Sequence, residues 1–349
     1  MREVVVPESE QCINILPEVD CMEKRIVFNG KNDISIEAFE PDAVIKGKVL
    51  IRTDYSMLST GTETTVLHRR FEAGSHFDKW IRYPCYPGYA LVGTVMETGP
   101  EVASLKPGDQ VACRCTHASC HVVREEDCVP ITPGIDLRQA IWFALAKIAA
   151  MGARVARYTL GSDVLVIGAG PIGQMALRWA VAAGSEKVIV ADMVKKRLQL
   201  AVSGGATAAV NRPVGESIEE IKAANNNALP SIVIDTTGNA AVFSSALEAC
   251  ADFGTVVVLG DTGAPTLQHL TKDVITRGLH VVGAHDNHEN AEWNITSITR
   301  LFFSLVQRNK FNLDGLNTHY FSTGQIREAY DIAETQRGET MGIIIDWSK

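Results

Sequence analysis

Residues 164–180 read VLVIGAGPIGQMALRWA, and this stretch decides the fold of the middle of the chain. A short run of apolar residues is followed by a turn that holds Gly168, Gly170 and Gly173, and then by a segment with helical character. Apolar strands that lead directly into helices are typical of a parallel sheet covered by helices on both faces. The stretch therefore predicts a strand, a tight turn and a helix of an α/β domain.

The spacing of the three glycines indicates that the turn binds a dinucleotide. The first glycine permits the tight turn, the second lets the backbone approach a pyrophosphate, and the third lets the helix pack closely on the strand. Free N–H groups and the dipole at the start of the helix attract the phosphate charge. A glycine-rich turn without a ligand is the alternative, but strand, glycines, helix, second strand and acid occur here in the order that the binding motif requires.

A second strand, KVIVAD, ends in Asp192, 19 residues after Gly173. A carboxylate at this place accepts hydrogen bonds from a ribose diol and repels a 2′-phosphate, so the sequence favours NAD over NADP. Lys195, Lys196 and Arg197 follow closely and could weaken this preference. The predicted coenzyme site consists of Gly168, Gly170, Pro171, Ile172, Gly173, Asp192, Arg197, Thr237, Leu259 and Gly260.

The pattern of the whole chain indicates an α/β protein of two domains. Strands such as KRIVFNG and KVLIRTDYSM, separated by glycine and proline turns, make the first part β-rich and barrel-like. Farther along, apolar strands such as SIVIDTTG and TVVVLG alternate with helices, and a last strand, GIIIDWS, can rejoin the first domain. We predict an extension at 1–22, a β-rich domain at 23–154, a doubly wound parallel-sheet domain at 155–305 and a return to the first domain at 306–349.

The composition excludes several classes of function. The residues are 46% apolar and 21% charged, which is typical of a globular protein. A chain of 349 residues is too long for one ordinary hydrophobic core, which indicates two domains. A net charge of −8 argues against nucleic acid or a membrane surface as the main partner, since both select basic patches. No apolar run reaches the ~18 residues of a membrane span, and the first residues lack a secretory signal. Eight cysteines in so long a chain do not make a disulfide scaffold, so we expect a cytoplasmic protein acting on a small molecule.

Several motifs together resemble one enzyme family. They are LSTGTE at 58–63, PGYALVGTV at 87–95, LKPGDQV at 105–111, the glycine-rich turn, VIDTTGN at 233–239 and GTVVVLG at 254–260. From about residue 24 to its end, the chain resembles the medium-chain dehydrogenase/reductase superfamily, which includes zinc alcohol and polyol dehydrogenases and quinone reductases. The resemblance implies a GroES-like β domain, a Rossmann domain, and hydride transfer in the cleft between them.

The chain departs from this family at the three positions that bind catalytic zinc. Thr60 stands in place of a cysteine, Tyr89 in place of the histidine of Gly-His-Glu, and the third ligand falls near Phe143–Ala144. Catalytic zinc requires three protein ligands and an open position, and these residues do not supply them. The sequence therefore predicts no metal at the site.

Four cysteines lie where the family has a structural zinc lobe, but their spacing differs from the family's pattern. The gaps between Cys113, Cys115, Cys120 and Cys128 are one, four and seven residues, and the loop is short. We expect Cys113 and Cys115 to point to opposite faces of a strand, and all four to be small buried thiols rather than metal ligands.

Without zinc, side-chain donors and a base must stabilise the developing negative oxygen and accept the hydroxyl proton. The resemblance implies that Lys147 faces the nicotinamide and that Thr62 is the hydroxyl of a proton relay. It also implies that Tyr89 takes the position of the zinc-binding histidine, and that Glu63 takes the position of the acid that orients this histidine. A partly buried lysine beside a cationic ring loses its proton more easily, which suits a general base or an oxyanion donor. The alternatives are a solvated helix lysine, an ordinary strand tyrosine, a turn hydroxyl and an acid that stabilises a helix start.

The segment FEAGSHFDKWIRYPCYP at 71–87 is predicted to form the outer wall of the cleft, with aromatic surface from Trp80 and Tyr83. His285 and His288 follow a predicted strand at the cleft or at a subunit edge, and a histidine has the natural pKa for proton transfer. The predicted substrate-binding residues are Thr60, Trp80, Tyr83, His285 and His288, with His117 and His121 as further candidates for proton transfer.

We therefore predict a zinc-independent, NAD-dependent dehydrogenase that interconverts a secondary alcohol and a ketone on a sugar, glycoside or cyclitol. The STGTE motif resembles glycoside 3-dehydrogenases and bacteriochlorophyllide hydroxyethyl dehydrogenases, so a chlorin side chain is an alternative substrate. A quinone- or enoyl-type reductase is a further alternative, which Asp192 disfavours because such enzymes use NADPH. A non-catalytic dinucleotide-binding protein is the fourth interpretation.

Relatives commonly join Rossmann sheets edge to edge, which predicts a homodimer or homotetramer through the strand near 279–285.

Overall fold

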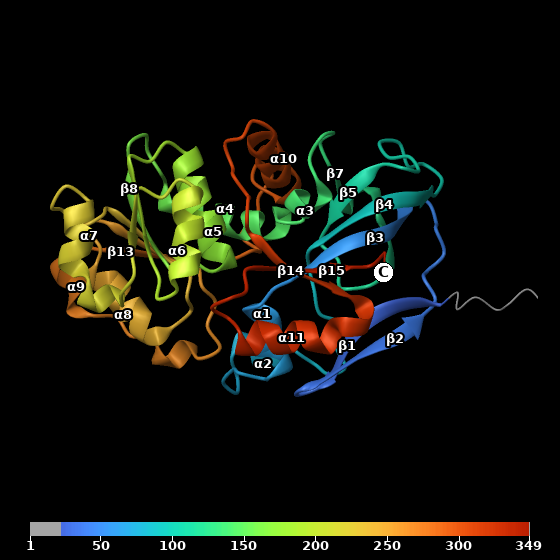
Figure 1. The fold of residues 1–349 in the computed structure, drawn as a ribbon, viewed down its shortest axis with the longest axis horizontal. Coiled ribbons are helices and arrows are strands. Elements are labelled where there is room, and N and C mark those ends of the chain that lie inside the picture. The colour runs from blue at the N-terminus through green and yellow to red at the C-terminus, as the bar shows by residue number, and fades with distance from the viewer. Residues whose placement is uncertain (1–21, 349) are drawn as a thin grey trace, which may run out of the picture.

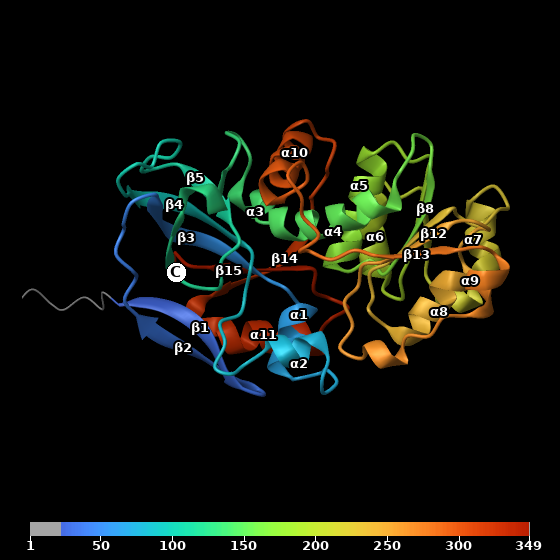
Figure 2. The same cartoon turned by 180° about the vertical axis from the view of Figure 1, so that it is seen from behind.

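A computed structural model describes residues 22–348 of the chain, and the predicted extension at 1–22 lies almost wholly outside these residues. The described chain forms two lobes side by side, a β-rich lobe and an α/β lobe, with helices between them (Figure 1). The second view, from behind, shows the same two lobes and the C-terminal end of the chain within the β-rich lobe (Figure 2). The fold class predicted from the sequence, a GroES-like β-rich domain and a Rossmann domain, is confirmed.

The β-rich lobe holds a seven-stranded sheet and a separate two-stranded hairpin. The sheet order is β14-β15-β3-β4-β5-β7, with β6 paired to β3. The last strand of the chain, β15, runs antiparallel to β3, so that Ile343 pairs with Leu58 and the C-terminal segment completes this sheet. The strands are β1 (Glu23–Gly30), β2 (Asp33–Phe39), β3 (Lys48–Leu58), β4 (Leu91–Thr98), β5 (Gln110–Cys113), β6 (Cys120–Arg124), β7 (Cys128–Pro130), β14 (Asn317–Ser322) and β15 (Gly342–Asp346).

Three helices pack at the bottom of this lobe, beside the hairpin of β1 and β2 (Figures 1 and 2). A buried cluster that includes Phe28, Leu58, Tyr330 and Ile345 joins them to β1, β3 and β15. The STGTE motif forms the turn from β3 into the first of these helices, so its side chains lie where the two lobes meet. The helices are α1 (Thr62–Leu67), α2 (His76–Trp80) and α11 (Ile326–Thr335).

The α/β lobe holds a six-stranded sheet in the order β10-β9-β8-β11-β12-β13, and all its pairs are parallel. Chain order reverses between β8 and β11, and in such sheets ligands bind at this reversal, outside the carboxyl ends of the strands. The elements are β8 (Asp163–Ile167), α5 (Pro171–Ala182), β9 (Lys187–Ala191), α6 (Lys195–Ser203), β10 (Ala208–Val210), α7 (Ile218–Ala224), β11 (Ile232–Asp235), α8 (Ala240–Glu248), β12 (Thr255–Val258), α9 (Lys272–Thr276) and β13 (His280–Gly283).

The central strand β8 explains why the apolar run in the sequence is continuous. Val164 and Val166 belong to the cluster that packs on α5, whereas Leu165 and Ile167 belong to the cluster that packs on α8. All four side chains are buried. A parallel strand covered by helices on both faces has no face left for polar residues, which produces the unbroken apolar pattern.

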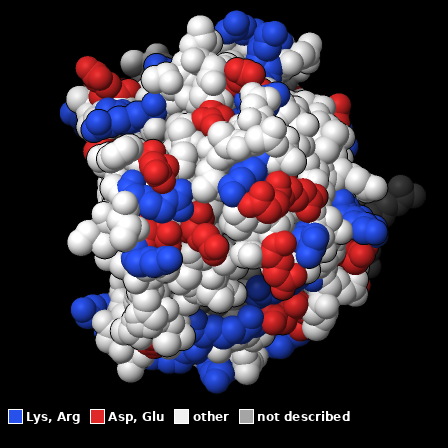
Figure 3. Space-filling view, turned by 90° about the vertical axis from the view of Figure 1, so that its left-hand side faces the viewer, with Lys and Arg blue, Asp and Glu red and all other residues white. Residues whose placement is uncertain are grey.

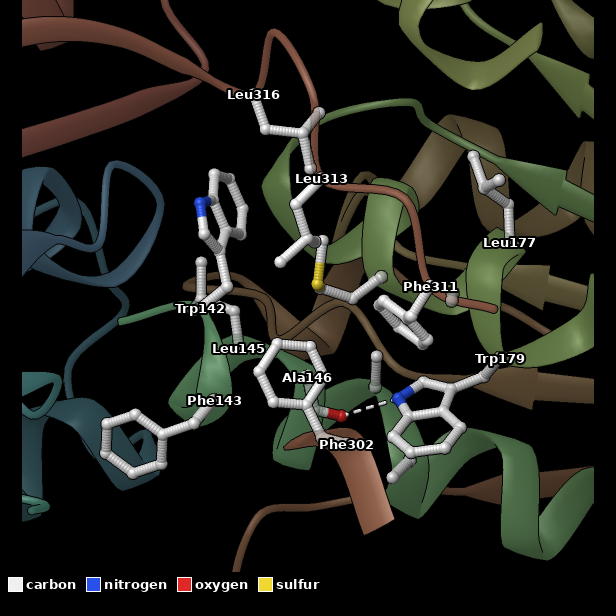
Figure 4. Packing of buried hydrophobic residues seen from close by; sticks show 14 of the residues in the cluster. Trp142, Phe143, Leu145, Ala146, Leu177, Trp179, Phe302, Phe311, Leu313 and Leu316 are labelled. Atoms are coloured by element: carbon white, nitrogen blue, oxygen red, sulfur yellow. Dashed lines mark hydrogen bonds between the residues drawn. The ribbon is translucent and has the colours of Figure 1, made fainter. Parts of the chain in front are cut away.

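One buried cluster runs through both lobes and fixes them against each other. It combines Val92 of the β-rich lobe with Val164 of the α/β lobe, and the helices between the lobes fill the space. In Figure 4, Trp179 points at α4 and its Nε1 donates a hydrogen bond to the carbonyl of Ala146 at 2.8 Å. The joining helices are α3 (Leu137–Ala140), α4 (Phe143–Ala156) and α10 (Ile295–Gln307). Short 3₁₀ turns lie at Glu125–Asp127, Val214–Glu216, Pro265–Leu267 and Thr323–Gln325.

Acidic and basic side chains are interspersed over most of the face at the outer end of the α/β lobe (Figure 3). A surface of mixed sign does not concentrate phosphate groups in the way that a broad basic patch does. Within residues 22–348, no helix combines the length and the apolar character that a bilayer crossing requires.

Candidate active site between the lobes

A cleft of about 1000 Å³ lies between the two lobes, at the carboxyl ends of β12 and β13. The β-rich lobe lines it with Thr62, Glu63 and Tyr89, which are three of the four predicted catalytic residues. The predicted substrate and coenzyme residues that line it are Trp80, Leu259, Gly260, His285 and His288. The structure thus brings together residues that are far apart in the sequence.

The positions at which the resemblance implies zinc ligands hold residues that do not fit the metal. Thr60 lies in the turn after β3, where its carbonyl accepts a hydrogen bond from Thr64 Oγ1 at 2.6 Å. It does not line the cleft, so its predicted role in substrate binding is not supported. Phe143 and Ala144 are fully buried and apolar. Among the residues that the structure describes, no group of three His, Cys, Asp or Glu side chains is placed to hold a metal ion.

Tyr89, which precedes β4, holds its phenol in a cluster of hydroxyl groups at the cleft. The phenol shares a short hydrogen bond with the hydroxyl of Ser59, and it also interacts with Thr62. The guanidinium of Arg114 lies over the ring, 4.6 Å from its centroid. Burial raises the pKa of the phenol and the charge of Glu63 adds to this effect, whereas Ser59, Arg114 and Thr62 act in the opposite direction. A hydroxyl cluster with a cation beside it can accept or donate a proton.

Glu63 is the centre of a buried hydrogen-bond network. Its Oε1 accepts a hydrogen bond from the backbone N–H of Ser59 at 2.7 Å, and its Oε2 accepts one from the hydroxyl of Tyr330. The same Oε2 hydrogen-bonds with His117 Nε2 at 3.0 Å, and His117 Nδ1 reaches Ser56 Oγ at 2.8 Å. The carboxylate therefore ties α1, α11 and β3 together, which is more than the helix-start role considered from the sequence.

Lys147 lies on α4 and is buried, so it is not a solvated helix residue. Its Nζ lies 2.8 Å from Asp286 Oδ1 and 2.6 Å from Glu289 Oε1, and it also donates to the Asp286 carbonyl. It lines a separate pocket of about 370 Å³ rather than the main cleft. Two carboxylates therefore engage the ammonium group, and it does not line the cleft in which a substrate would lie. The prediction that Lys147 is the general base is therefore corrected.

The predicted substrate residues divide into two groups. Trp80 is 63% exposed and lines the cleft, as do His285 and His288, whose ring centroids are 5.9 Å apart. Tyr83 does not line the cleft, because its hydroxyl donates to the carbonyl of Val66 at 2.5 Å, and its predicted substrate role is corrected accordingly.

His117 and His121 were also candidates for proton transfer, and neither is among the residues that line the cleft. His117 is fully buried in the Glu63 network. His121 Nε2 hydrogen-bonds with the carbonyl of Thr116 at 3.0 Å, and burial lowers its pKa. Both histidines have structural partners instead of access to a substrate.

The glycine-rich turn has the shape that a pyrophosphate needs. Gly168 has φ of +88°, and a Cβ there would lie 2.8 Å from Thr236 Oγ1. A Cβ on Gly173 would lie 1.9 Å from the carbonyl oxygen of Gly168, so only glycine lets the helix come this close. Gly170 precedes α5, Pro171 is its first residue, and the guanidinium of Arg197 lies nearby. The turn thus offers free N–H groups and a cation to a phosphate group.

Asp192 follows β9 directly beside this turn. Its Oδ2 accepts a hydrogen bond from the N–H of Ala169 at 2.7 Å, and its Oδ1 accepts one from Val194 at 2.7 Å. A carboxylate oxygen has lone pairs for further donors, so a ribose diol can still be bound there. Thr237 follows β11, where its hydroxyl donates to Asp235 Oδ1 at 2.6 Å.

The cysteines differ from the prediction in two respects. Cys113, Cys120 and Cys128 are buried as expected, but Cys115 is only half-buried. Cys113 and Cys115 are two positions apart and therefore share a face of the chain, and the thiols of Cys115 and Cys128 both hydrogen-bond with Cys113. Cys113 also lies opposite Cys128 in the β5–β7 register. These hydrogen bonds and burial raise the pKa of the Cys113 thiol. The expectation that Cys113 and Cys115 point to opposite faces is wrong.

Several site residues were not found from the sequence. Ser59, Arg114 and Tyr330 contact the predicted residues, and no motif distinguishes Arg114 or Tyr330 from an ordinary core or loop residue. Ser59 alone had a local signal, because it lies inside the STGTE stretch.

The sequence matches two family models, the "Alcohol dehydrogenase GroES-like domain" over residues 46–138 and the "Zinc-binding dehydrogenase" over residues 171–298. It is 29% identical over 302 residues to L-threonine 3-dehydrogenase of Paraburkholderia xenovorans, covering 77% of this chain and 84% of that protein. It is 25% identical over 354 residues to sorbitol dehydrogenase of Bombyx mori, covering 91% of this chain and 97% of that protein.

Solved structures share the fold at lower identity. A dehydrogenase of Sinorhizobium meliloti 1021, bound to NADP, superimposes with a TM-score of 0.79 at 19% identity, covering 93% of this chain and 99% of that one. An alcohol dehydrogenase of Escherichia coli CFT073, in complex with NADH, gives a TM-score of 0.78 at 19% identity, covering 93% of this chain and 100% of that one. The chain therefore belongs to the medium-chain dehydrogenase/reductase superfamily, among its zinc-type alcohol dehydrogenase-like members, and is an NAD(P)-dependent oxidoreductase.

Proposed function

We propose that this protein is a zinc-independent, NAD-dependent dehydrogenase that interconverts a secondary alcohol and a ketone on a polyhydroxylated substrate such as a sugar, glycoside or cyclitol. The observation that carries the proposal is the cluster of Tyr89, Ser59 and Thr62 at the cleft, where other members of the family have zinc ligands. Hydroxyl donors and a tyrosine can hold a negative oxygen without a metal.

When bound at the glycine-rich turn, a nicotinamide dinucleotide supplies the ring that takes up the hydride. In the oxidation direction Tyr89 acts in its ionised, phenolate form: the substrate O–H bond breaks and its proton passes to the phenolate oxygen, which becomes the phenol. The carbonyl forms as the hydrogen on the same carbon leaves with both electrons of its C–H bond. Ser59 and Thr62 hold the phenol by hydrogen bonds, and Glu63 fixes the backbone of Ser59 from behind.

A polyhydroxylated substrate fits the chemistry of the cleft walls. The exposed ring of Trp80 offers an apolar face, and the His285 and His288 rings on the other lobe offer hydrogen-bonding groups. Sugars and cyclitols present both an apolar ring face and several hydroxyls. The names of the sorbitol and threonine dehydrogenases, whose substrates carry a secondary hydroxyl, support the same reaction class.

The preference for NAD rests on Asp192. Its carboxylate is held beside the turn by two backbone N–H groups, so it cannot easily move away from a 2′-phosphate. We also propose a cytoplasmic homodimer or homotetramer joined through the edge strand β13. Leu267, Leu270 and Ile275, near this strand in the sequence, are exposed apolar residues of the kind that an interface covers.

Turnover of a substrate panel with NAD⁺ tests the proposal. The panel holds sorbitol, myo-inositol, methyl glucoside and L-threonine, followed by NADH absorbance. On the best substrate, Tyr89→Phe should lower kcat/KM by about 100-fold, the contribution of a positioned acid–base group, while NADH binding stays unchanged. Tyr86→Phe is the matched control, since Tyr86 also lines the cleft but donates to Glu37. Full activity of Tyr89→Phe would contradict the assignment of Tyr89.

A further inference from the structure

Arg114, in the loop after β5, has an arrangement that the proposed reaction does not yet use. Its Nη2 donates to Asp286 Oδ2, and its guanidinium lies over the ring of Tyr89. Its Nη1 is buried and has no hydrogen-bond partner within the described residues. Arg114 therefore stacks on the ring of Tyr89 with one nitrogen left without a hydrogen-bond partner, so its contact with the ring is electrostatic.

Arg114 belongs to a chain of ion pairs that crosses from one lobe to the other. Asp286, in the loop after β13, bridges Arg114 to Lys147, and Lys147 pairs in turn with Glu289. All four side chains line the pocket of about 370 Å³, and two of them, Arg114 and Asp286, also line the main cleft. Lys147 is almost fully buried, so the chain of charges is anchored on α4, at the centre of the molecule.

Stacking over Tyr89 gives Arg114 a specific electrostatic effect. A positive charge 4.6 Å from the ring centroid favours the ionised phenol, and a guanidinium keeps that charge at every pH at which proteins are folded. Burial and the Glu63 charge act in the opposite direction and raise the pKa of the phenol. The pKa of the phenol stays raised with Arg114 in place, so removal of this cation should raise it further and make the phenolate rarer.

We propose that Arg114 is a positioning residue that prepares Tyr89 for proton transfer, and that the Asp286–Lys147–Glu289 ion pairs hold Arg114 in place. The proposal rests on the proposed role of Tyr89 as the proton acceptor. Arg114 then supplies, through the tyrosine, the positive charge that a metal supplies in zinc-dependent members of the family. Lys147 acts two ion pairs away, which accounts for a buried lysine that does not reach the cleft.

The groups that face the Tyr89 phenol come from four elements. They are Ser59 after β3, Thr62 and Glu63 on α1, and Arg114 after β5, with Asp286 after β13 behind the arginine. Glu63 is the carboxylate that opposes ionisation of the phenol, and it is already engaged by three hydrogen-bond partners. Arg114 is therefore the cation whose removal should change the titration of Tyr89.

The pH profile of kcat/KM for alcohol oxidation, measured on the best substrate of the panel, tests the proposal. In Arg114→Gln the pH at which kcat/KM rises should increase by about one pH unit or more. At pH values below this rise, kcat/KM should therefore fall about tenfold. Arg114→Lys restores the charge without the planar stack and should recover part of the shift. Arg82→Gln is the control, because Arg82 also lines the cleft but donates to the carbonyls of Asp78 and Ile81.

A second measurement needs no turnover. The ultraviolet absorbance of tyrosinate, titrated with pH, gives the ionisation of Tyr89 as the difference between a protein and its Tyr89→Phe variant. The Arg114→Gln background should show this ionisation at higher pH. The variant should fold, because Asp286 keeps Lys147 at 2.8 Å and no carboxylate is left without a partner.

The possible outcomes separate the two proposals. An activity of Arg114→Gln that falls equally at all pH values, with the Tyr89 titration unmoved, would show a structural role only and overturn the inference about Arg114. Full activity of Tyr89→Phe would instead remove the proposed role of the tyrosine. A shifted pH profile that Arg114→Lys partly reverses supports the inference.

Discussion

Oε2 of Glu63 lies 3.0 Å from Nε2 of His117, and both side chains are buried. The hydroxyl of Tyr330 donates to the same oxygen, and Trp347 Nε1 donates to the Ser56 hydroxyl on the far side of the imidazole at 2.9 Å. The network joins the STGTE turn to the last helix and the last residues of the chain. It fixes the wall of the cleft from which Tyr89 and Thr62 act.

Replacing Glu63 by glutamine should destabilise the protein. The amide oxygen still accepts a hydrogen bond from the N–H of Ser59. The NH₂ group, however, faces His117 and the hydroxyl of Tyr330, which donates a hydrogen bond to this position in the wild type. A buried donor without an acceptor costs roughly 1–3 kcal/mol, which lowers the melting temperature by several degrees. Thermal unfolding followed by circular dichroism measures the change, and an unaltered melting temperature would contradict the role of Glu63 as the network centre.

Gly88 should tolerate no side chain, because it lies against His117. Its φ is +97°, and a Cβ there would lie 2.7 Å from His117 Cδ2. Gly88→Ala should cost roughly 1–2 kcal/mol for the backbone conformation and a further 1–3 kcal/mol for overpacking. Gly108→Ala is the matched control, since Gly108 has φ of +93° and nothing within 4 Å of its Cβ position. Equal losses in the two variants, measured by denaturant unfolding, would disprove the contact with His117.

Lys147→Met should leave Asp286 and Glu289 close together without the ammonium group between them. We expect a loss of about 1–3 kcal/mol, because an unpaired polar group near the core bears its desolvation cost. The double variant with Glu289→Gln removes one of the two carboxylates and should recover part of the loss. Denaturant unfolding of both single variants and the double variant gives the coupling. Strict additivity would mean that the ion pair between Lys147 and Glu289 does not stabilise the fold.

Asp192→Asn should weaken discrimination between the two coenzymes. The amide keeps an acceptor for a backbone N–H group but loses the charge that repels a 2′-phosphate. The ratio of dissociation constants, NADPH over NADH, should be well above one in the wild type and should fall about tenfold in the variant, equivalent to 1.4 kcal/mol. Quenching of protein fluorescence by each coenzyme measures both constants. A wild-type preference for NADPH would reverse the assignment of NAD.

The parts of the fold that depend on neighbours in the sequence could be predicted from it. The glycine-rich turn, α5, β9 and Asp192 lie within 30 residues, and the requirement for glycine at 168 and 173 follows from the close approach of strand and helix. The alternation of apolar strands and helices gave the parallel sheet in the same way. Each of these features depends on the geometry of neighbouring residues, and this geometry determines the residue types and their spacing in the sequence.

The site could be predicted only in part, because its contacts join distant segments. Tyr330 lies 267 residues from Glu63, and Asp286 lies 139 residues from Lys147, so no spacing in the sequence brings them together. Lys147 was placed correctly on a helix, but its function depends on which charges meet it from the other lobe. Arg114 could not be identified, since an arginine after a strand is usually a solvated residue.

The metal content of the active protein tests the proposed zinc independence most directly. The protein is dialysed exhaustively against a strong chelator, its zinc is measured by elemental mass spectrometry, and its turnover of the best panel substrate with NAD⁺ is compared with that of untreated protein. Full activity with far less than one zinc ion per chain is the expected result. Activity that is lost with the metal and restored by one equivalent of zinc would contradict it.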